Sequence, residues 1–397
     1  MAKEQITVIG GGLAGLVAAL SLAKAGSLAK TGRRVTLLEQ TRHLGGRAAT
    51  THQSGFSLNL GPHAIYACGA LCRTLREWQI PFTGKPPAVS SGFLVEGTRT
   101  HRFPYDTAGL LLTSALSPGE KMQAARLLQS IPKEQGGSRS VHQWLDDARA
   151  TGRARRLIES VVALTTYTRD MAGLSAAAAL RQLRLALGTG VLYVDGGWET
   201  LVNGLAAAAQ AAGVVIETGV PVERLPSGPA VLAVPPQTVE QLTGTKLARY
   251  VPVKLATLDL GLSQLPPKSA TFGLGLDRPF YFSVHSAVAA LAPPDAAMVH
   301  VGKYLAAGEE GSREELEQFA DVLMPGWRER VVVARFLPNL VVTHAISTVE
   351  PRPEVHSLGL PGIAIAGDWV GNNAMLADAA AQSALDAAAW LTNGSRQ

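Results

Sequence analysis

Cysteine is scarce in this chain: Cys68 and Cys72 are the only two among 397 residues. A structural zinc site needs further Cys or His residues at short spacing, so we predict packed thiols and no metal site. No run of about 18 uninterrupted apolar residues occurs, which argues against a membrane-spanning helix. The first apolar run, Ile6 to Ile9, begins almost at Met1 and leaves no room for a cleavable signal, so we expect a cytoplasmic location.

Charge is also sparse. Charged residues make up 17% of the chain, and the formal net charge of +5 is spread along it, which predicts no nucleic-acid partner. The densest basic run, from Arg149 to Arg156, falls on an expected helix, and a solvated face is the favoured interpretation. A membrane surface or an anionic ligand is the alternative, which leaves peripheral membrane contact open.

Hydrophobic residues, by contrast, reach 47%, enough to bury a large core, and the length predicts two domains. The stretch "QITVIGGGLAGLVAAL" is typical of a strand, a glycine turn and a helix, with Gly10, Gly12 and Gly15 matching G-x-G-x-x-G. The first glycine permits the tight turn, the second lets backbone approach a pyrophosphate, and the third allows close helix packing. A second strand, "RRVTLLEQ", brings in Glu39, whose carboxylate suits a ribose hydroxyl.

A repeated hexapeptide, "SLAKAGSLAKTG" from Ser21 to Gly32, lies between the turn and this acid. The spacing from Gly15 to Glu39 is 24 positions with both copies and 18 with one, on either side of the usual value of about 20. Six extra helical residues would rotate the apolar face by about 240°. We therefore expect the second copy to protrude as a loop, with the helix ending at Gly26.

Three further stretches extend the pattern: "TRHLGGRAAT", "LNLGPHAIYA" and "GIAIAGDWVGNNAMLADAAAQSAL". With the glycine turn they make the chain resemble the flavin-dependent amine oxidase, phytoene desaturase and protoporphyrinogen oxidase superfamily. The resemblance covers nearly the whole chain in the same order, because "VDGGWETLVNGLAAAAQAAGVVIETGVPVERL" is similar to the central segment of that family and "AVLAVPP" to its return strand.

The resemblance implies an α/β fold: a Rossmann-like FAD-binding domain of the glutathione-reductase type with a second, α+β substrate domain. The FAD domain is expected from residues 1–75, 195–245 and 335–397, and the substrate domain from 76–194 and 246–334. Within the latter, 106–190 is expected to be helical, broken at Pro132 and the "QGGS" loop, and 246–334 to form strands.

The implied cofactor is FAD, bound non-covalently because neither cysteine lies in the C-terminal stretch. The expected cofactor-binding residues, with their neighbours in each motif, are Gly10, Gly12, Leu13, Ala14, Gly15, Glu39, Gln40, Gly46, Arg47, Gly61, Pro62, His63, Val222, Gly367, Asp368, Met375 and Leu376.

By resemblance, Arg47 lies along the pyrophosphate and ribityl chain, Asp368 accepts from ribityl hydroxyls, and Val222 belongs to a strand beside the adenine. A helix starting near Ala374 then directs its N-terminus at the flavin pyrimidine edge. The alternatives are an exposed arginine at a glycine turn for Arg47 and a helix cap for Asp368.

The candidate catalytic residues are His63, Tyr66, Lys303 and Asn372, with His285 a further polar candidate; a structural role is the alternative for each. Asn372 and Asn373 stand where amine oxidases of the family carry paired aromatics, which weakens an amine substrate.

We expect an FAD-dependent enzyme that dehydrogenates or isomerises a hydrophobic small molecule by hydride transfer. The alternatives are a flavin amine oxidase, a nicotinamide-dependent Rossmann dehydrogenase and a non-catalytic FAD-binding protein. Substrate identity, electron acceptor, a side-chain base and oligomeric state stay open.

Overall fold

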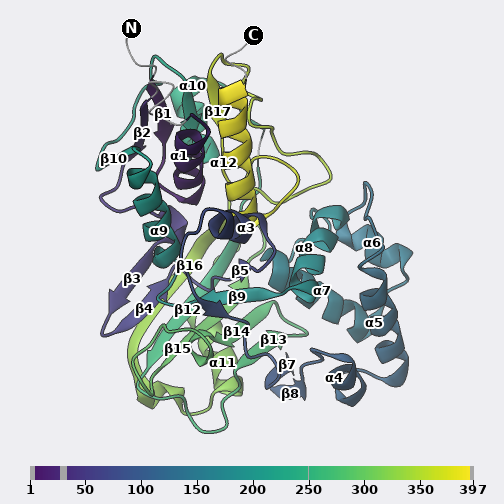
Figure 1. The fold of residues 1–397 in the computed structure, drawn as a ribbon. Coiled ribbons are helices and arrows are strands. Elements are labelled where there is room, and N and C mark those ends of the chain that lie inside the picture. Colours follow the sequence, from purple (N-terminus) through teal and green to yellow (C-terminus); the bar gives the residue numbers. More distant parts are fainter. Residues whose placement is uncertain (1–4, 27–33, 249, 394–397) are drawn as a thin grey trace.

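The computed structural model describes residues 5–26, 34–248 and 250–393. One large sheet lies above the other in Figure 1, and a helical lobe lies to the right of the lower sheet. The first sheet is parallel, with strand order β10-β2-β1-β11-β17. Its strands are β1 Gln5–Ile9, β2 Arg34–Glu39, β10 Val215–Thr218, β11 Ala230–Leu232 and β17 Ile363–Ile365. Parallel strands from three distant segments confirm the Rossmann-like part of the expected fold class.

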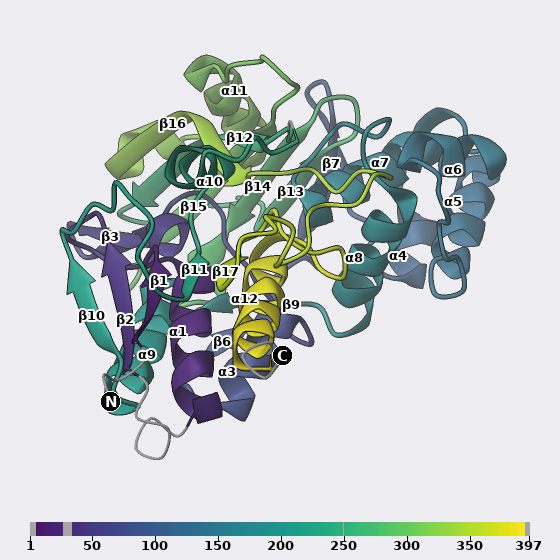
Figure 2. The ribbon, with the colours of Figure 1, turned by 90° about the horizontal axis from the view of Figure 1, so that it is seen from above.

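Helices cover this sheet. Their bounds are α1 Leu13–Gly26, α9 Glu199–Ala211, α10 Pro236–Thr243 and α12 Leu376–Asn393. Helices α1 and α12 pack against each other, and small or apolar side chains such as Leu16, Ala19 and Ala384 are fully buried between these layers. Seen from above, α1, α9 and α12 lie together on one side of the strands (Figure 2).

The second sheet is mixed, with order β16-β12-β15-β14-β13-β7-β8. Its strands are β7 Gly92–Glu96, β8 Arg99–Arg102, β12 Val253–Leu262, β13 Phe272–Gly275, β14 Phe280–Val284, β15 Ala297–Tyr304 and β16 Val331–Thr343. Only the β7–β13 pair among these is parallel within the described chain. Helix α11, Arg313–Leu323, packs on one face. The last segment of the FAD-binding domain was expected to begin at residue 335. Strand β16 continues to Thr343, so residue 335 lies within a strand of the second sheet.

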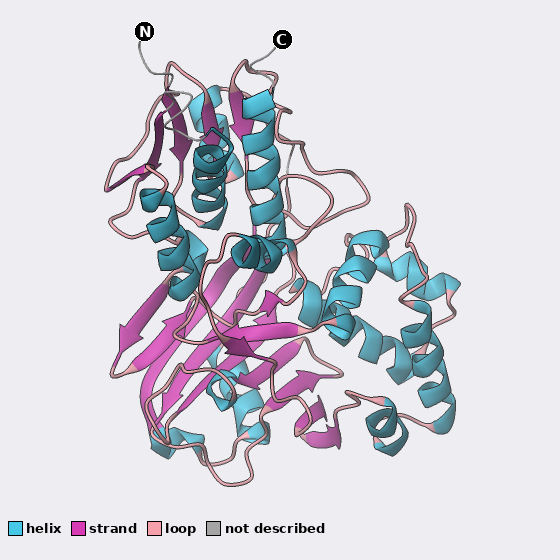
Figure 3. Cartoon of the chain, in the orientation of Figure 1, coloured by secondary structure: helices cyan, strands magenta, loops and turns pink. Residues whose placement is uncertain are grey.

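A helical lobe lies beside the second sheet (Figure 3). It comprises α4 Thr107–Leu112, α5 Pro118–Ser130, α6 Val141–Asp147, α7 Gly152–Thr166 and α8 Ala176–Gly188. Helix α5 begins with a capping box between Ser117 and Glu120 and ends just before Pro132, as proline geometry requires. Sheet and helices together confirm an α+β second part.

Short elements connect the two parts. They are the hairpin β3 Thr50–Gln53 and β4 Phe56–Asn59, the strands β5 Ile65–Tyr66, β6 Gly84–Lys85 and β9 Val191–Val194, and the helix α3 Ala70–Glu77. Cys72 is buried on α3, whereas Cys68 is exposed before it, so only one thiol is packed.

The hexapeptide repeat lies at the edge of the described residues. Helix α1 is described as far as Gly26, and β2 begins at Arg34. The second copy, Ser27 to Gly32, lies outside the described residues. Among the helices that the structure describes, none has the length and apolar character needed to cross a bilayer.

Candidate functional site

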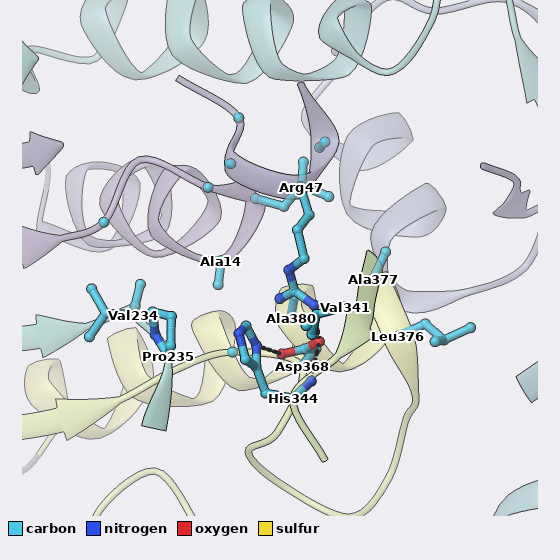
Figure 4. Close-up of a pocket in the computed structure, with 18 of the residues that line it drawn as sticks. Ala14, Arg47, Val234, Pro235, Val341, His344, Asp368, Leu376, Ala377 and Ala380 are labelled. Carbon is cyan, nitrogen blue, oxygen red and sulfur yellow. Dashed lines mark hydrogen bonds and ion pairs between the residues drawn. The ribbon is translucent and has the colours of Figure 1, made fainter. Parts of the chain in front are cut away.

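A cavity of about 590 Å³ runs from the β1–α1 turn to the second sheet. Figure 4 shows part of its wall, with Val234 and Pro235 on one side, Leu376 and Ala377 on the other, and Arg47 and Asp368 between them. The expected residues that line it are Gly10, Gly12, Leu13, Ala14, Glu39, Gln40, Gly46, Arg47, Pro62, His63, Tyr66, Val222, Gly367, Asp368 and Leu376.

The glycine turn forms the first wall. Gly10 has φ of +105°, and a Cβ there would lie 2.4 Å from the Ala233 carbonyl oxygen. A Cβ at Gly15 would lie 1.8 Å from the Gly10 carbonyl oxygen, so Gly15 shapes the turn and does not line the cavity. At Gly12 the nearest atom would be the Gly45 oxygen, at 3.8 Å. Gly12 therefore presents open backbone to a ligand at the N-terminus of α1, where phosphate binding is favourable.

Glu39 closes the nucleotide end of the cavity. Its Oε2 accepts a hydrogen bond from the Gly11 backbone N–H at 2.6 Å, and its Oε1 accepts from the Thr41 backbone N–H and hydroxyl, each at 2.8 Å. The carboxylate is thus held between the glycine turn and the chain after β2. Val222 lines the same region but lies beyond β10, outside any strand, which corrects the strand expected around it.

An ion pair crosses the middle of the cavity. Arg47 donates through Nη1 to Asp368 Oδ2 at 2.6 Å and to the Val342 carbonyl at 2.7 Å. His344 approaches the other carboxylate oxygen, with Nδ1 3.2 Å from Oδ1 (Figure 4). Burial raises the pKa of Asp368, but Arg47 and His344 outweigh burial and hold that pKa well below its usual range. Asp368 is therefore ionised at neutral pH.

The far end is apolar with a few hydroxyl groups. Leu255, Leu340 and Tyr167 line it together with Pro62 and Tyr66. The Tyr66 hydroxyl donates to the Thr165 carbonyl at 2.9 Å, and the Tyr167 hydroxyl donates to the Pro62 carbonyl at 3.0 Å. Burial raises the pKa of both hydroxyls, so they remain neutral.

His63 lies between two backbone carbonyls. Its Nδ1 is 3.1 Å from the Gly61 oxygen, its Nε2 is 3.1 Å from the Arg47 oxygen, and its ring meets Trp198 edge-on. Burial lowers the pKa of His63 to about 4, so the ring is neutral at pH 7 and donates to one carbonyl at a time. The imidazole ties the Gly61 loop to the Arg47 loop at the cavity wall. Gly61 itself packs against Thr257 and Leu340 and does not line the cavity.

Two candidate catalytic residues do not line the cavity. Lys303 is buried in β15 and pairs with Glu309 and Glu315 at 2.9 and 2.7 Å. Asn372 binds backbone atoms of Arg352, accepting at 2.7 Å and donating at 3.0 Å. Both side chains are occupied by structural contacts. A buried lysine requires counterions, and the side-chain amide of an asparagine in a turn readily forms hydrogen bonds with nearby backbone.

Two other expected residues also lie away from the cavity. Met375 packs into the core of the helical lobe. His285 is 1% exposed, stacks on Tyr193, and has Nε2 3.0 Å from the Tyr281 hydroxyl. Its place within a buried polar cluster keeps it from the cavity wall.

Several lining residues were not among those expected. His344 follows the end of β16, Asp378 lies in the first turn of α12, and Tyr167, Leu255 and Leu340 come from the second part of the fold. A polar residue just after a strand was the signal for His344, and an acid in a first helical turn was the signal for Asp378. The apolar residues have no signal that distinguishes them from core.

The donor set fits FAD. Open backbone at Gly12, a cation at Arg47 and carboxylates at Glu39 and Asp368 lie along one cavity that ends in an apolar chamber. No cluster of three or more metal-ligating side chains occurs in the described part of the chain.

Comparisons with known proteins match parts of the sequence. The model of the NAD(P)-binding Rossmann-like domain matches residues 8–78. A carotenoid 3,4-desaturase from Haloarcula japonica is 44% identical over 62 residues, 16% of this chain and 11% of that protein. Human protoporphyrinogen oxidase is 34% identical over 119 residues, 28% of this chain and 24% of that protein. These matches therefore span less than a quarter of either relative.

Solved structures match across the whole chain. An oxidoreductase from Methanosarcina mazei has a TM-score of 0.75 at 17% identity and covers 96% of this chain and 99% of its own. Putrescine oxidase bound to putrescine gives 0.67 at 15% identity over 98% and 99%. Rab GDI from Plasmodium falciparum gives 0.64 at 11% identity over 99% of both. The chain thus has the fold that these solved structures share, and part of its sequence is similar to a carotenoid desaturase and to a protoporphyrinogen oxidase.

Proposed function

We propose that this protein is an FAD-dependent oxidoreductase that dehydrogenates or isomerises a hydrophobic small molecule, with FAD bound non-covalently. The observation that carries the proposal is one cavity that joins a dinucleotide turn, an Arg47–Asp368 pair and an apolar chamber lined by Leu255 and Leu340. When bound, the flavin supplies the hydride acceptor.

The chain's own residues divide the remaining work. The Gly12 backbone and Arg47 hold the pyrophosphate, and Glu39 accepts from ribose hydroxyls. Asp368 is ionised and accepts from ribityl hydroxyls. Leu255, Leu340 and the neutral Tyr167 ring exclude water from the C–H bond that reacts.

The substrate chamber favours an uncharged substrate over an amine. Its described lining near Tyr66 and Tyr167 holds neutral hydroxyls already bonded to backbone carbonyls, whereas the Asp378 carboxyl group at that end is the feature that would favour an amine. Putrescine oxidase shares the fold, so an amine oxidase is the second candidate. Asn372 forms a hydrogen bond with the Arg352 backbone and does not line the cavity, so its position does not support the binding of an amine substrate by this residue.

A non-catalytic FAD-binding protein is the third candidate, because Rab GDI shares the same fold without bearing an enzyme's name. A nicotinamide-dependent dehydrogenase would use the glycine turn but would leave the Arg47–Asp368 pair without a ligand role.

The test begins with the purified protein. We expect yellow protein whose flavin is released by acid precipitation and migrates as FAD; a yellow pellet over a colourless supernatant would contradict non-covalent binding. Polyenes, porphyrinogens and amines are then added anaerobically while the flavin absorbance is followed. Bleaching by a polyene or porphyrinogen supports the proposal, bleaching by amines alone favours the second candidate, and no bleaching by any class favours the third.

We also propose peripheral membrane contact through the helical lobe, since a hydrophobic substrate would partition into lipid. Leu111 and Leu112 on α4 are 66% and 67% exposed, and Met122 on α5 is 56% exposed. Exposed apolar side chains of this kind suit a lipid surface. Flotation with anionic vesicles should carry the wild type but not L111S/L112S, and equal flotation of both would contradict this contact.

A further inference from the structure

Asp378 is a buried carboxyl group on the cavity wall. It lies in the first turn of α12 and is 4% exposed. Its Oδ1 accepts from the Leu71 backbone N–H at 2.9 Å, in the first turn of α3. The starts of two helices therefore converge on one carboxyl group. Its Oδ2 is also buried and has no hydrogen-bond partner within the described residues.

The surrounding backbone is fitted to this carboxyl group. A Cβ at Gly69 would lie 2.2 Å from Oδ2 and 2.4 Å from Oδ1, so only glycine leaves room for the side chain. Leu376 and Ala377, the residues just before Asp378, lie on the opposite side of Asp368 from Val234 and Pro235 (Figure 4). Val234 adjoins the glycine turn, where the proposed FAD would place its pyrophosphate. Asp378 therefore lies at the opposite end of the cavity, where the flavin ring would lie.

No cation neutralises Asp378 among the described ion pairs. The titratable groups that face it are Tyr66 on β5 and Cys72 and Arg73 on α3, and Arg73 is exposed. Burial raises the pKa of Asp378 to about 6, and the Leu71 N–H and Arg73 offset burial only in part. The carboxyl group is thus mostly ionised at pH 7.5, and an added negative charge nearby would favour its protonation.

We propose that Asp378 binds a solvent proton when the flavin at this end of the cavity is reduced. The inference rests on the proposed FAD binding. A hydride brings two electrons and one proton to the ring and leaves one added negative charge there. A solvent proton then binds Oδ2 and converts the carboxylate to the neutral acid, while Oδ1 keeps its hydrogen bond from Leu71. The buried charge at this end is unchanged by the two events together.

The test measures the flavin midpoint potential against pH, from about pH 6.5 to about pH 8.5, in FAD-loaded wild type, D378N and D386N. Asparagine preserves an acceptor for the Leu71 N–H. Asp386 is exposed two turns further along α12 and provides the matched control. We expect the slope of wild type and D386N to exceed that of D378N by about 30 mV per pH unit, because one extra proton accompanies two electrons.

A second measurement does not require the variant to bind FAD. The infrared difference spectrum of wild type, reduced minus oxidised, should gain the carbonyl stretch of a protonated carboxyl group. Equal slopes in wild type and D378N, or absence of this band from wild type that binds FAD, would overturn the inference but leave the proposed function intact. Wild type that binds no FAD would overturn both.

Discussion

Arg47 Nη1 and Asp368 Oδ2 lie 2.6 Å apart, although 321 residues separate them in the chain. The same Arg47 nitrogen donates to the carbonyl of Val342 on β16. One guanidinium therefore joins the turn after β2, the end of the second sheet and the loop after β17. These are three of the segments that form the middle of the cavity.

Replacing Arg47 by alanine should weaken FAD binding about 10- to 100-fold, because one charge-assisted hydrogen bond contributes about 1.5–3 kcal/mol. Titration of the apoprotein with FAD measures this, and R42A, on the same loop and exposed, is the control. R47K should lie between wild type and R47A, since lysine keeps the charge but loses the planar fork. Unchanged affinity in R47A would remove Arg47 from the site.

The same variant should alter the pH dependence of apoprotein stability. In wild type the pKa of Asp368 is far below its usual range, so its contribution to stability is present above the unfolded pKa and is lost only in strong acid. In R47A the guanidinium no longer offsets the effect of burial, so the pKa of Asp368 rises. The gap in unfolding free energy between wild type and R47A should therefore widen from pH 4 to pH 7, as urea titrations at each pH would measure; a constant gap contradicts the assignment.

Glu39 carries a second prediction. E39A should weaken FAD binding by about 10- to 100-fold for each ribose hydrogen bond lost, and it should also lower stability because the Gly11 and Thr41 N–H groups lose their acceptor. E39Q keeps one carbonyl oxygen and should lie between E39A and wild type. A titration in which E39A binds FAD as tightly as wild type would place the ribose elsewhere.

The parts of the fold that local patterns determine could be predicted. The glycine turn, the start of α1 after it and the end of β2 at Glu39 all follow from spacing and residue type within about 30 residues. The motif at Asp368 was found instead through the resemblance to the flavin-dependent superfamily. These positions satisfy backbone requirements that few residue types meet.

Long-range packing determined the rest. Lys303 looked available for chemistry, yet α11 brings Glu315 to within 2.7 Å of it. His344 was not among the expected residues, because its position against Asp368 arises only when the fold brings β16 beside the loop after β17. Leu255 and Leu340 have the same apolar pattern as any core strand, so no sequence signal separates a cavity wall from a packed interior.

A third prediction concerns Asp378 in the apoprotein. Its folded pKa of about 6 lies above the ordinary aspartate value of 3.8, so its contribution to stability is fully present below about pH 4 and is lost as pH rises through 6. D378N does not titrate. The unfolding free energy of D378N relative to wild type should therefore rise by on the order of 2–3 kcal/mol between about pH 4 and pH 7.5. Urea titrations at both pH values check this, and a flat difference would show that the carboxyl group is not raised in pKa.

The last prediction concerns the second hexapeptide. Helix α1 is described as far as Gly26 and β2 begins at Arg34, with seven residues of sequence between these two positions. Removing all of Ser27 to Gly32 would leave Arg33 alone, shorter than the two to six residues usual for a helix-to-strand connection. Deleting only Ser27 to Lys30 leaves three, which is within that range.

The four-residue deletion should leave FAD affinity and the flavin spectrum unchanged, because the glycine turn and Glu39 keep their places at the ends of β1 and β2. Loop closure entropy changes by only about 0.6 kcal/mol per doubling of loop length, so the thermal midpoint should move by a few degrees at most. If the second copy instead packs against the body of the protein, its removal would cost several kcal/mol, as core truncations do. A midpoint lowered by more than about 10 °C in differential scanning calorimetry would therefore contradict the protruding-loop interpretation.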